Sequence, residues 1–554
     1  MSVLAKPVSF IRRSWLAVTS FSFLLLLLAF SWWSVPLSDF DFWWHIKTGQ
    51  YILENRGLPD KDPFTFTSIE NEQEAPDRPP VILKSYWLSQ ILLYLVYAYT
   101  GAAGTIIFKA LVLFLILLAL WSYLNRRGAS QVVSFFMLVV LVFFIRDYLG
   151  ARPQIFSFLF AALCFVSLEA SRTENKGHWS LPLLMLVWAN MHGGFMVGIC
   201  FILIYAIGVM LGKRPWKEKY PVLLNYSISI LLTLANPVTY HTLAMFIAAQ
   251  DSLVLNETLE FQSPITYFNY VSWNWYPLFV FVAGGLVLVM TDIVTRIKRK
   301  SGILPVEHSL LLIGTSAAAL LSMRYGIFFM IIAVPVAALW LSSRISLTAG
   351  LYVRTALLMA VVLLSCFSPL AAAVKTGVLV DESVIPVRGV EFIRKNSLPS
   401  NIYNDISSGG YMAWRLYPEY KTFVDTRVLN PDIYRQYMSI LYGNMNSFFG
   451  IPEWKALLDN YRIKTIVHGT VNPFTGEIYP LMQILVKDAA WHLVYFDGQI
   501  AILTKELPAE LPEIPRNMLF QEMRSEIMRG LGRFPGHPGF NRSLIILKAM
   551  EAGA

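Results

Sequence analysis

The sequence predicts a polytopic α-helical membrane protein that carries a small α/β domain near its C-terminal end. Of its 554 residues, 56% are hydrophobic and only 15% are charged, whereas soluble globular proteins are about a quarter charged and less than half apolar. Apolar runs long enough to cross a bilayer recur up to about residue 373. Beyond residue 374 the charged residues return and the apolar runs become short, which indicates a separate domain outside the lipid.

The apolar runs predict about eleven membrane-spanning helices, since a span needs about 20 apolar residues. The first run lacks a small-residue cleavage site, so we expect a retained helix and not a signal peptide. The stretch 179–212 is interrupted by "NMHGG" and is read as two short helices, with one long kinked helix as the alternative. The expected spans are 15–37, 103–124, 130–146, 153–171, 179–192, 194–212, 221–237, 275–293, 307–323, 325–342 and 351–373.

The distribution of basic residues predicts the orientation, because cytoplasmic loops are enriched in Lys and Arg. Lys6, Arg12 and Arg13 place the N-terminus in the cytoplasm, so the first loop, 38–84, is expected outside. The segment "YWLSQILLYLVYAYTG" is then an outer-face or partly embedded helix. With this topology the later basic clusters fall inside and the C-terminal domain is extracytoplasmic, as in a multi-pass protein of the inner cell membrane. The net charge of +9 therefore indicates cytoplasmic loops, not nucleic-acid binding.

Three regions are expected: a transmembrane domain at 1–374, an α/β domain at 375–506 and an amphipathic tail at 507–554. In the second region, short β-rich runs such as "SNIYND" and "IKTIVHG" alternate with helical stretches such as "EWKALLDNYR". The three cysteines all lie inside apolar runs without CxxC spacing, which predicts neither a disulfide framework nor a zinc site.

Polar residues beside spanning helices are costly, so each is a functional candidate. Alone, each has an ordinary explanation: Trp43 and Trp44 are interpreted as interface anchors, and a single histidine often bonds a helix end. Acids, bases and cations from five predicted outer turns nevertheless converge, which favours function. The candidates are Asp39, Asp41, His45, Arg146, Arg152, Asn190, His192, His241, Glu260 and Arg324.

This set suits glycosyl transfer from a lipid-linked phosphosugar. A carboxylate can act as general base on an acceptor hydroxyl, while arginines bind phosphate through a bidentate fork and stay charged. Arg152 and Arg324 both begin spans at the outer face, so they are assigned to the donor phosphate, with Arg146 beside them. His45, His192, Asn190, His241 and Glu260 are assigned supporting roles.

The first outer loop, "LSDFDFWWHIKTGQYILENRGLPDKDPFTFT", resembles that of GT-C-type glycosyltransferases, which include protein O-mannosyltransferases, aminoarabinose transferases and oligosaccharyltransferases. The resemblance covers about residues 15–345 in layout and implies that an aspartate after the first helix, Asp39 or Asp41, is catalytic. The segment "SSGGYMAWRLYPEYKTFVDTR" also looks like a recurring element of bacterial relatives. The WWDYG-type signature of oligosaccharyltransferases is absent, so sequon recognition is not inferred.

The two aspartates are two positions apart, and in an extended segment both would face the same way. We expect "SDFDF" to be extended and favour Asp41 as base with Asp39 in support. Asp425 and Arg427 are candidate acceptor contacts, with a structural ion pair as the alternative. No cofactor is required, and no ligand cluster demands a divalent metal, although Asp41 with His45 could contribute to one.

The predicted function is therefore a membrane glycosyltransferase that moves a sugar from a polyprenyl-phosphate-linked donor to an extracytoplasmic glycan, lipid or protein acceptor. A transporter or flippase is one alternative, but it predicts charges near the bilayer midplane and two related halves, and no repeat is evident in the sequence. A non-catalytic GT-C-like protein of cell-envelope polysaccharide assembly is the other alternative.

Overall fold

The computed structural model describes most of the chain and divides it into two compact units. Unit 1 comprises residues 1–37 and 84–379, and unit 2 comprises residues 38–83 and 380–554. Each unit is considered by itself. The residues described are 25–26, 28–29, 35–67, 78–145, 148, 150–242, 261–265, 276–299, 302–345, 377–448, 451–472, 475–533 and 536–552.

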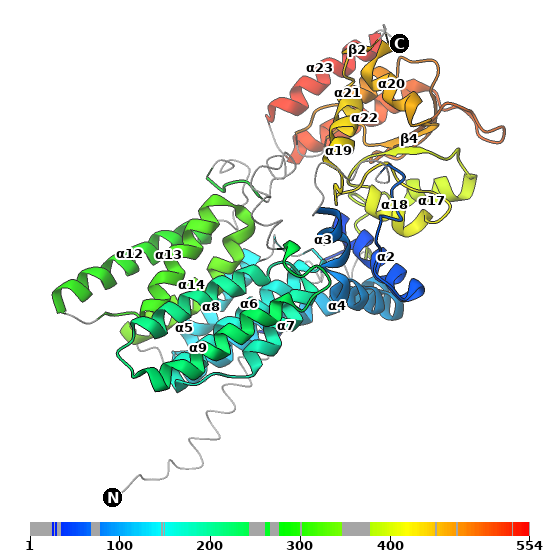
Figure 1. Ribbon diagram of the computed structural model, residues 1–554. Coiled ribbons are helices and arrows are strands. Elements are labelled where there is room, and N and C mark those ends of the chain that lie inside the picture. The colour runs from blue at the N-terminus through cyan, green and yellow to red at the C-terminus, as the bar shows by residue number, and fades with distance from the viewer. Residues whose placement is uncertain are drawn as a thin grey trace, which may run out of the picture. The chain divides into compact units, whose positions relative to one another are not determined.

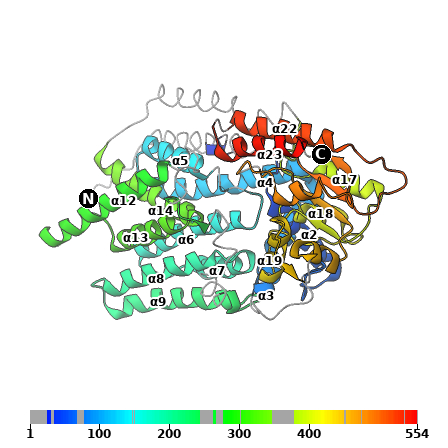
Figure 2. The same cartoon turned by 90° about the horizontal axis from the view of Figure 1, so that it is seen from above.

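Unit 1 is a bundle of helices that lie side by side in both views (Figures 1 and 2). Among the described residues of unit 1, four helical segments are long and apolar enough to cross a membrane, and four more are shorter and apolar, as expected for a membrane protein. Its described helices are α4 (Trp87–Arg126), α5 (Gln131–Ile145), α6 (Gln154–Glu174), α7 (Ser180–Met191), α8 (Phe195–Leu211), α9 (Trp216–Leu231), α12 (Tyr276–Arg299), α13 (Val306–Leu321) and α14 (Gly326–Arg344), with 3-10 turns η2 (Leu232–Leu234) and η7 (Met323–Tyr325).

Most of these helices begin and end within about three residues of the predicted spans where the structure describes them. The exceptions are α9, which lies five to six residues before the predicted 221–237, α12, which ends six residues beyond the predicted 275–293, and the start of α4. The stretch 179–212 is two helices, α7 and α8, which end and begin around His192 and Gly194, so the split is confirmed. Helix α4 starts at Trp87 and bends at Gly101, whose φ of 65° lies outside the helical region. The predicted helix before residue 101 therefore joins the next span through a glycine kink. The span 351–373 and most of the span 15–37 lie outside the described residues.

A buried carboxylate joins four helices of unit 1. Glu169 of α6 accepts hydrogen bonds from Tyr123 of α4 (2.8 Å) and Tyr205 of α8 (2.7 Å). Arg172 donates to both of its oxygens at 2.8 Å, and His308 Nε2 of α13 lies 2.9 Å away. Glu169 lies near the end of α6 opposite to Gln154, so a strongly polar group is also buried at the other end of this helix. With so many partners on one carboxylate, we read this cluster as a structural anchor.

Unit 2 brings the first outer loop together with the C-terminal region. Its sheet has the strand order β1-β4-β6-β5, with β1 parallel to β4 and the other pairs antiparallel. The mixture of strands and helices predicted from the short apolar runs is confirmed. The described elements are α2 (Phe40–Asn55), α3 (Arg78–Lys84), α17 (Val387–Asn396), β1 (Ile402–Asn404), α18 (Gly409–Leu416), α19 (Pro431–Leu441), β2 (Ser447–Phe448), β3 (Ile451–Pro452), α20 (Glu453–Asn460), β4 (Thr465–His468), α21 (Pro480–Leu485), β5 (His492–Phe496), β6 (Ala501–Thr504), α22 (Arg516–Arg533) and α23 (Pro538–Ala552).

The hydrophobic core of unit 2 corrects two of the predicted boundaries. Helices α22 and α23 pack against each other (Figures 1 and 2), and their Phe520, Ile527 and Leu547 are buried in the same core as Ile466 of β4 and Leu503 of β6. The region 507–554 is therefore part of the domain and not a separate tail. Likewise the loop 38–83 belongs to unit 2 and not to the transmembrane domain, because its contacts are with the C-terminal region.

Candidate functional site

The two candidate aspartates lie at the first turn of α2. Asp39 is the N-cap residue: its backbone is extended, and its Oδ1 accepts a hydrogen bond from the amide of Asp41 at 2.9 Å, the usual task of an N-cap carboxylate. Asp41 is already helical, so the expectation of a wholly extended "SDFDF" segment is wrong. The physical reason is the cap itself, since Asp39 satisfies an amide that the helix leaves unpaired.

The carboxylate of Asp41 accepts hydrogen bonds from Trp44 and Thr426. Its Oδ1 accepts from the indole Nε1 of Trp44 at 3.2 Å and from the hydroxyl of Thr426 at 2.5 Å. Asp41 is half-buried and sits where the amides of α2 favour negative charge. Hydrogen bonds to the charged form of a carboxylate stabilise that form. The arrangement suits an ionised carboxylate in a defined orientation.

The tryptophans after Asp41 are buried in protein. Trp43 is 1% exposed and Trp44 is 5% exposed, and the Trp43 ring meets the Tyr411 ring of α18 edge-on, with centroids 4.7 Å apart. Their interpretation as interface anchors is therefore wrong, because neither ring is available to lipid. A Cβ added to Gly410 of α18 would lie only 2.8 Å from the carbonyl oxygen of Phe40, so this glycine permits α18 to approach the start of α2.

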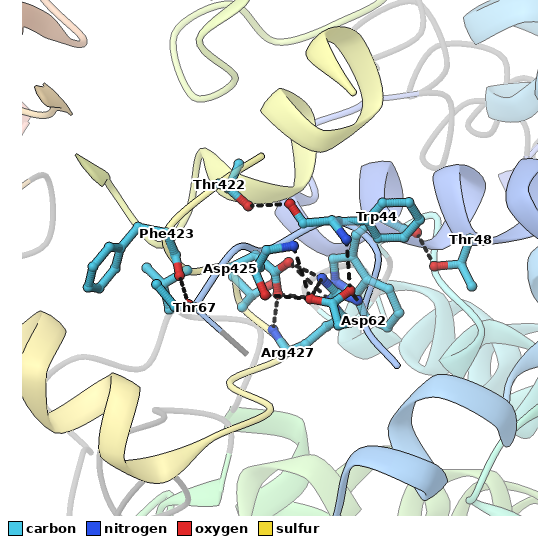
Figure 3. Close-up of polar contacts among 12 residues, drawn as sticks. Trp44, Thr48, Asp62, Thr67, Thr422, Phe423, Asp425 and Arg427 are labelled. Atoms are coloured by element: carbon cyan, nitrogen blue, oxygen red, sulfur yellow. Dashed lines mark hydrogen bonds and ion pairs between the residues drawn. The ribbon is translucent and has the colours of Figure 1, made fainter. Parts of the chain in front are cut away.

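A second acidic group of the first loop is locked into a buried ion cluster (Figure 3). Nη1 and Nη2 of Arg427 donate to the two oxygens of Asp62 at 2.8 and 3.1 Å. Nε of Arg427 donates to Asp425 Oδ1 and Oδ2 at 2.9 and 3.0 Å, and a further bond joins Nη2 to Asp425. The guanidinium also lies over the rings of Trp44 and Phe64, 5.7 and 5.4 Å from their centroids.

This cluster bears on the two interpretations of Arg427 and Asp425, acceptor contact or structural ion pair. Burial opposes the charge of Arg427, but the carboxylates of Asp425 and Asp62 raise its pKa above its usual range. The side chains of Arg427 and Asp62 are 1% exposed and that of Asp425 is 2% exposed. All three nitrogens of the guanidinium bond to carboxylates, so the structural ion pair is favoured over acceptor contact. Asp62 was not singled out in the sequence, although "DKDP" stands inside the loop segment that carries the resemblance.

His45 and Lys47 of α2 are also buried. The ring of His45 lies against Trp44 in a tilted arrangement, with centroids 3.5 Å apart. The Lys47 amino group lies 5.1 Å from the centre of the Tyr417 ring and donates to Gln50. Burial lowers the pKa of Lys47. Among the residues that the structure describes, no group of three or more His, Cys, Asp or Glu could hold a metal ion.

Asn190 and His192 of unit 1 lie in a polar network around the end of α7. Asn190 accepts from Trp87 Nε1 at 3.0 Å and donates to the carbonyl of Ala235 at 2.8 Å. His192 Nδ1 accepts from the amide of Gly194 at 3.0 Å and lies 2.7 Å from the hydroxyl of Ser157. Because a backbone amide can only donate, Nδ1 is an acceptor and a neutral ring carries its proton on Nε2. The Gly194 bond to His192 closes the turn between α7 and α8, whereas the Asn190 bonds join α7 to α4 and to the residue after η2.

The remaining candidates of unit 1 are dispersed over several turns. Arg152 is half-buried just before α6, and Arg324 of η7 lies over the Phe261 ring, 4.8 Å from its centroid. His241 stacks on Tyr240 with centroids 4.4 Å apart. Arg146 and Glu260 lie outside the described residues, so their contacts stay predictions.

The fold of the chain is similar to that of a solved membrane enzyme. The archaeal oligosaccharyltransferase AglB from Archaeoglobus fulgidus, in complex with an inhibitory peptide and a dolichol-phosphate, matches with a TM-score of 0.55 and 12% identity, over 94% of this chain and 78% of that protein. The Archaeoglobus fulgidus oligosaccharyltransferase tethered with an acceptor peptide containing the NVT sequon via a disulfide bond matches with a TM-score of 0.53 and 13% identity, over 92% and 76%. No family model matches the sequence, and no curated protein is significantly similar to it. At such identity the likeness shows the fold, and the fold expected from the first-loop resemblance is confirmed.

Proposed function

Because the chain has the fold of the GT-C-type membrane glycosyltransferases, we propose that it is a membrane glycosyltransferase that uses a polyprenyl-phosphate-linked sugar. The acceptor is an extracytoplasmic glycan, lipid or protein. Asp41 is the general base and Asp39 supports it by capping α2. The observation that carries the proposal is the Asp41 carboxylate, which Trp44 and Thr426 hold at the start of α2 within a fold of this type.

Glycosyl transfer requires a base at the acceptor hydroxyl and a cation at the donor phosphate. The carboxylate takes the proton of the attacking hydroxyl as the bond to the sugar forms. The bond from the sugar to the phosphate oxygen breaks, and the leaving lipid phosphate gains negative charge. Arg152, Arg324 and Arg146 are assigned to that charge, because guanidinium stays ionised and binds phosphate oxygens in pairs. The presence of dolichol-phosphate in the AglB complex supports a lipid phosphate as the donor class.

The test is single-turnover transfer by the purified protein in lipid nanodiscs. The probes are radiolabelled polyprenyl-monophosphate hexose and a polyprenyl-pyrophosphate oligosaccharide, with water as the acceptor hydroxyl. The readout is release of polyprenyl phosphate from the first donor and of polyprenyl pyrophosphate from the second. We expect Asp41→Asn to lower the rate by about 10²–10⁴, the usual contribution of a general base. Glu54→Gln is the matched control, since it removes one exposed carboxylate from the same helix.

Two outcomes would contradict the proposal. If Asp41→Asn and Asp39→Asn both transfer sugar as fast as Glu54→Gln, then neither aspartate is catalytic. If the protein moves the labelled lipid between the leaflets without releasing phosphate, it is a flippase. Both measurements use preparations that show equal expression and equal thermal midpoints.

A further inference from the structure

The hydroxyl of Thr426 donates to Asp41 Oδ1 at 2.5 Å, although the two residues are separated by 385 positions in sequence. We propose that Thr426 is a positioning residue for Asp41: it fixes the plane of the carboxylate and stabilises its charged form. The proposal rests on the proposed function, in which Asp41 is the base. Sequence reasoning selected Asp425 and Arg427 on either side of Thr426 and passed over the threonine between them.

Thr426 is itself held in a rigid turn. The amide of Val428 donates to the carbonyl of Asp425 at 3.1 Å, so Thr426 and Arg427 are the two central residues of a closed β-turn. The amide of Arg427 donates to Asp425 Oδ1 at 3.0 Å. Val428, the residue that ends the turn, has a φ of 41°, a conformation that a β-branched residue adopts only where its surroundings impose it.

The ion cluster of Arg427 fixes this turn against the first loop. Arg427 bonds through its side chain to Asp425 of the same turn and to Asp62 of the loop. Asp62 in turn accepts from the amides of Phe64 and Thr65 at 3.2 and 3.1 Å. The turn that carries the Thr426 hydroxyl is therefore tied to the loop that follows α2, and α2 carries Asp41.

Trp44 and Thr426 donate to the same oxygen of Asp41. Trp44 Nε1 approaches Oδ1 from within α2, and the Thr426 hydroxyl reaches it from the turn. Two bonds from different elements restrict rotation of the carboxylate more than either bond does alone. Ionisable side chains that the structure describes in this region include Asp39, His45, Lys47 and the Asp62–Arg427–Asp425 cluster, and a substitution at position 426 replaces none of them. A substitution at position 426 therefore tests the effect of the Thr426 hydroxyl on Asp41.

The test measures protonation of Asp41 without using the transfer reaction. A carbodiimide reacts with protonated carboxyl groups, so peptide mass spectrometry of labelled protein between pH 4 and 8 gives a titration midpoint for Asp41. Thr426→Val removes the donor with little change in shape, and Thr426→Ser keeps it. We expect Thr426→Val to raise the Asp41 midpoint by roughly one pH unit, because a bond to a charged group is lost, and Thr426→Ser to leave it unchanged. Asp39, in the same peptide, is the internal reference.

The controls separate the possible failures. If Thr426→Val does not fold, Thr426→Ala is used, with the same expected shift. The proposal is overturned if the donor-deficient variants keep the wild-type Asp41 midpoint, or if Thr426→Ser shifts it as far as they do. In nanodiscs we expect Thr426→Val to lower kcat and leave KM unchanged, and Thr426→Ser to restore kcat. A shifted midpoint together with full transfer by Asp41→Asn would overturn the proposed function while the Thr426 hydrogen bond still stood.

Discussion

Arg427 binds Asp62 across 365 positions of sequence, with 2.8 Å between Nη1 and Oδ1. The pair is buried, and it connects the loop after the first predicted span with the domain after the last one (Figure 3). Unit 2 is thus assembled from two distant parts of the chain, and the acidic start of α2 is held by residues that follow residue 400.

Loss of the Arg427 side chain should destabilise unit 2 strongly. We expect Arg427→Met to lower the free energy of unfolding by about 3–5 kcal/mol, because two carboxylates would remain buried without their cation. Arg435→Met is the control, since Arg435 is 52% exposed and pairs with Asp432 at the surface, where the loss is at most about 1 kcal/mol. The measurement is thermal unfolding of the purified proteins. Equal midpoints for the two variants would contradict the role of the cluster.

The close approach of α18 to α2 should not tolerate a side chain at Gly410. A Cβ there would lie 2.8 Å from the backbone oxygen of Phe40, so we expect Gly410→Ala to cost about 1–3 kcal/mol by overpacking and to reduce transfer. In α22 a Cβ on Gly532 meets nothing within 4 Å. Gly532→Ala should be neutral or stabilise by up to about 1 kcal/mol, as expected in a helix. If both substitutions lower the thermal midpoint by the same amount relative to the wild-type protein, the packing argument is refuted.

The arginines of unit 1 should contribute to binding of lipid phosphate. We expect Arg152→Gln, Arg324→Gln and Arg146→Gln each to weaken binding of a fluorescent polyprenyl phosphate by about 10- to 100-fold, since a bond to a charged group contributes about 1.5–3 kcal/mol. Arg127→Gln is the control, because Arg127 is exposed at the end of α4. Binding curves that coincide with that of the control would remove the phosphate assignment.

Glu526 of α22 should make the stability of unit 2 depend on pH. Burial raises its pKa to about 8, although the hydroxyl of Thr470 and the charge of Arg529 act in the opposite direction. The folded state therefore binds one more proton than the unfolded state between about pH 4.5 and 8, and stability declines as pH rises through this range. We expect the thermal unfolding midpoint to decrease as the pH is raised from 5 to 8.

Two variants identify Glu526 as the source of that slope. Glu526→Gln should flatten the pH dependence, because the amide does not ionise. Glu510→Gln removes an exposed carboxylate and should keep the wild-type slope. An unchanged slope in Glu526→Gln would assign the pH dependence to another group.

The sequence by itself determined the class of the protein and the identity of its main candidate residues. Apolar runs are local quantities, so they predicted most of the described helices of unit 1 within a few residues and the break near His192. The acidic loop after the first predicted span was likewise identified from its own amino-acid sequence. Strands such as Ile402–Asn404 were visible as short apolar runs between helical stretches.

Tertiary structure alone decided what those residues contact. Burial of Trp43 against Tyr411, the bond from Thr426 to Asp41 and the pairing of Asp62 with Arg427 all join segments that are more than 300 positions apart. A local sequence pattern carries no information on such pairs, because the type of a residue does not reveal whether its side chain contacts lipid, water or a distant segment of the chain. These contacts form only when the chain folds, and they hold the candidate base, Asp41, in unit 2.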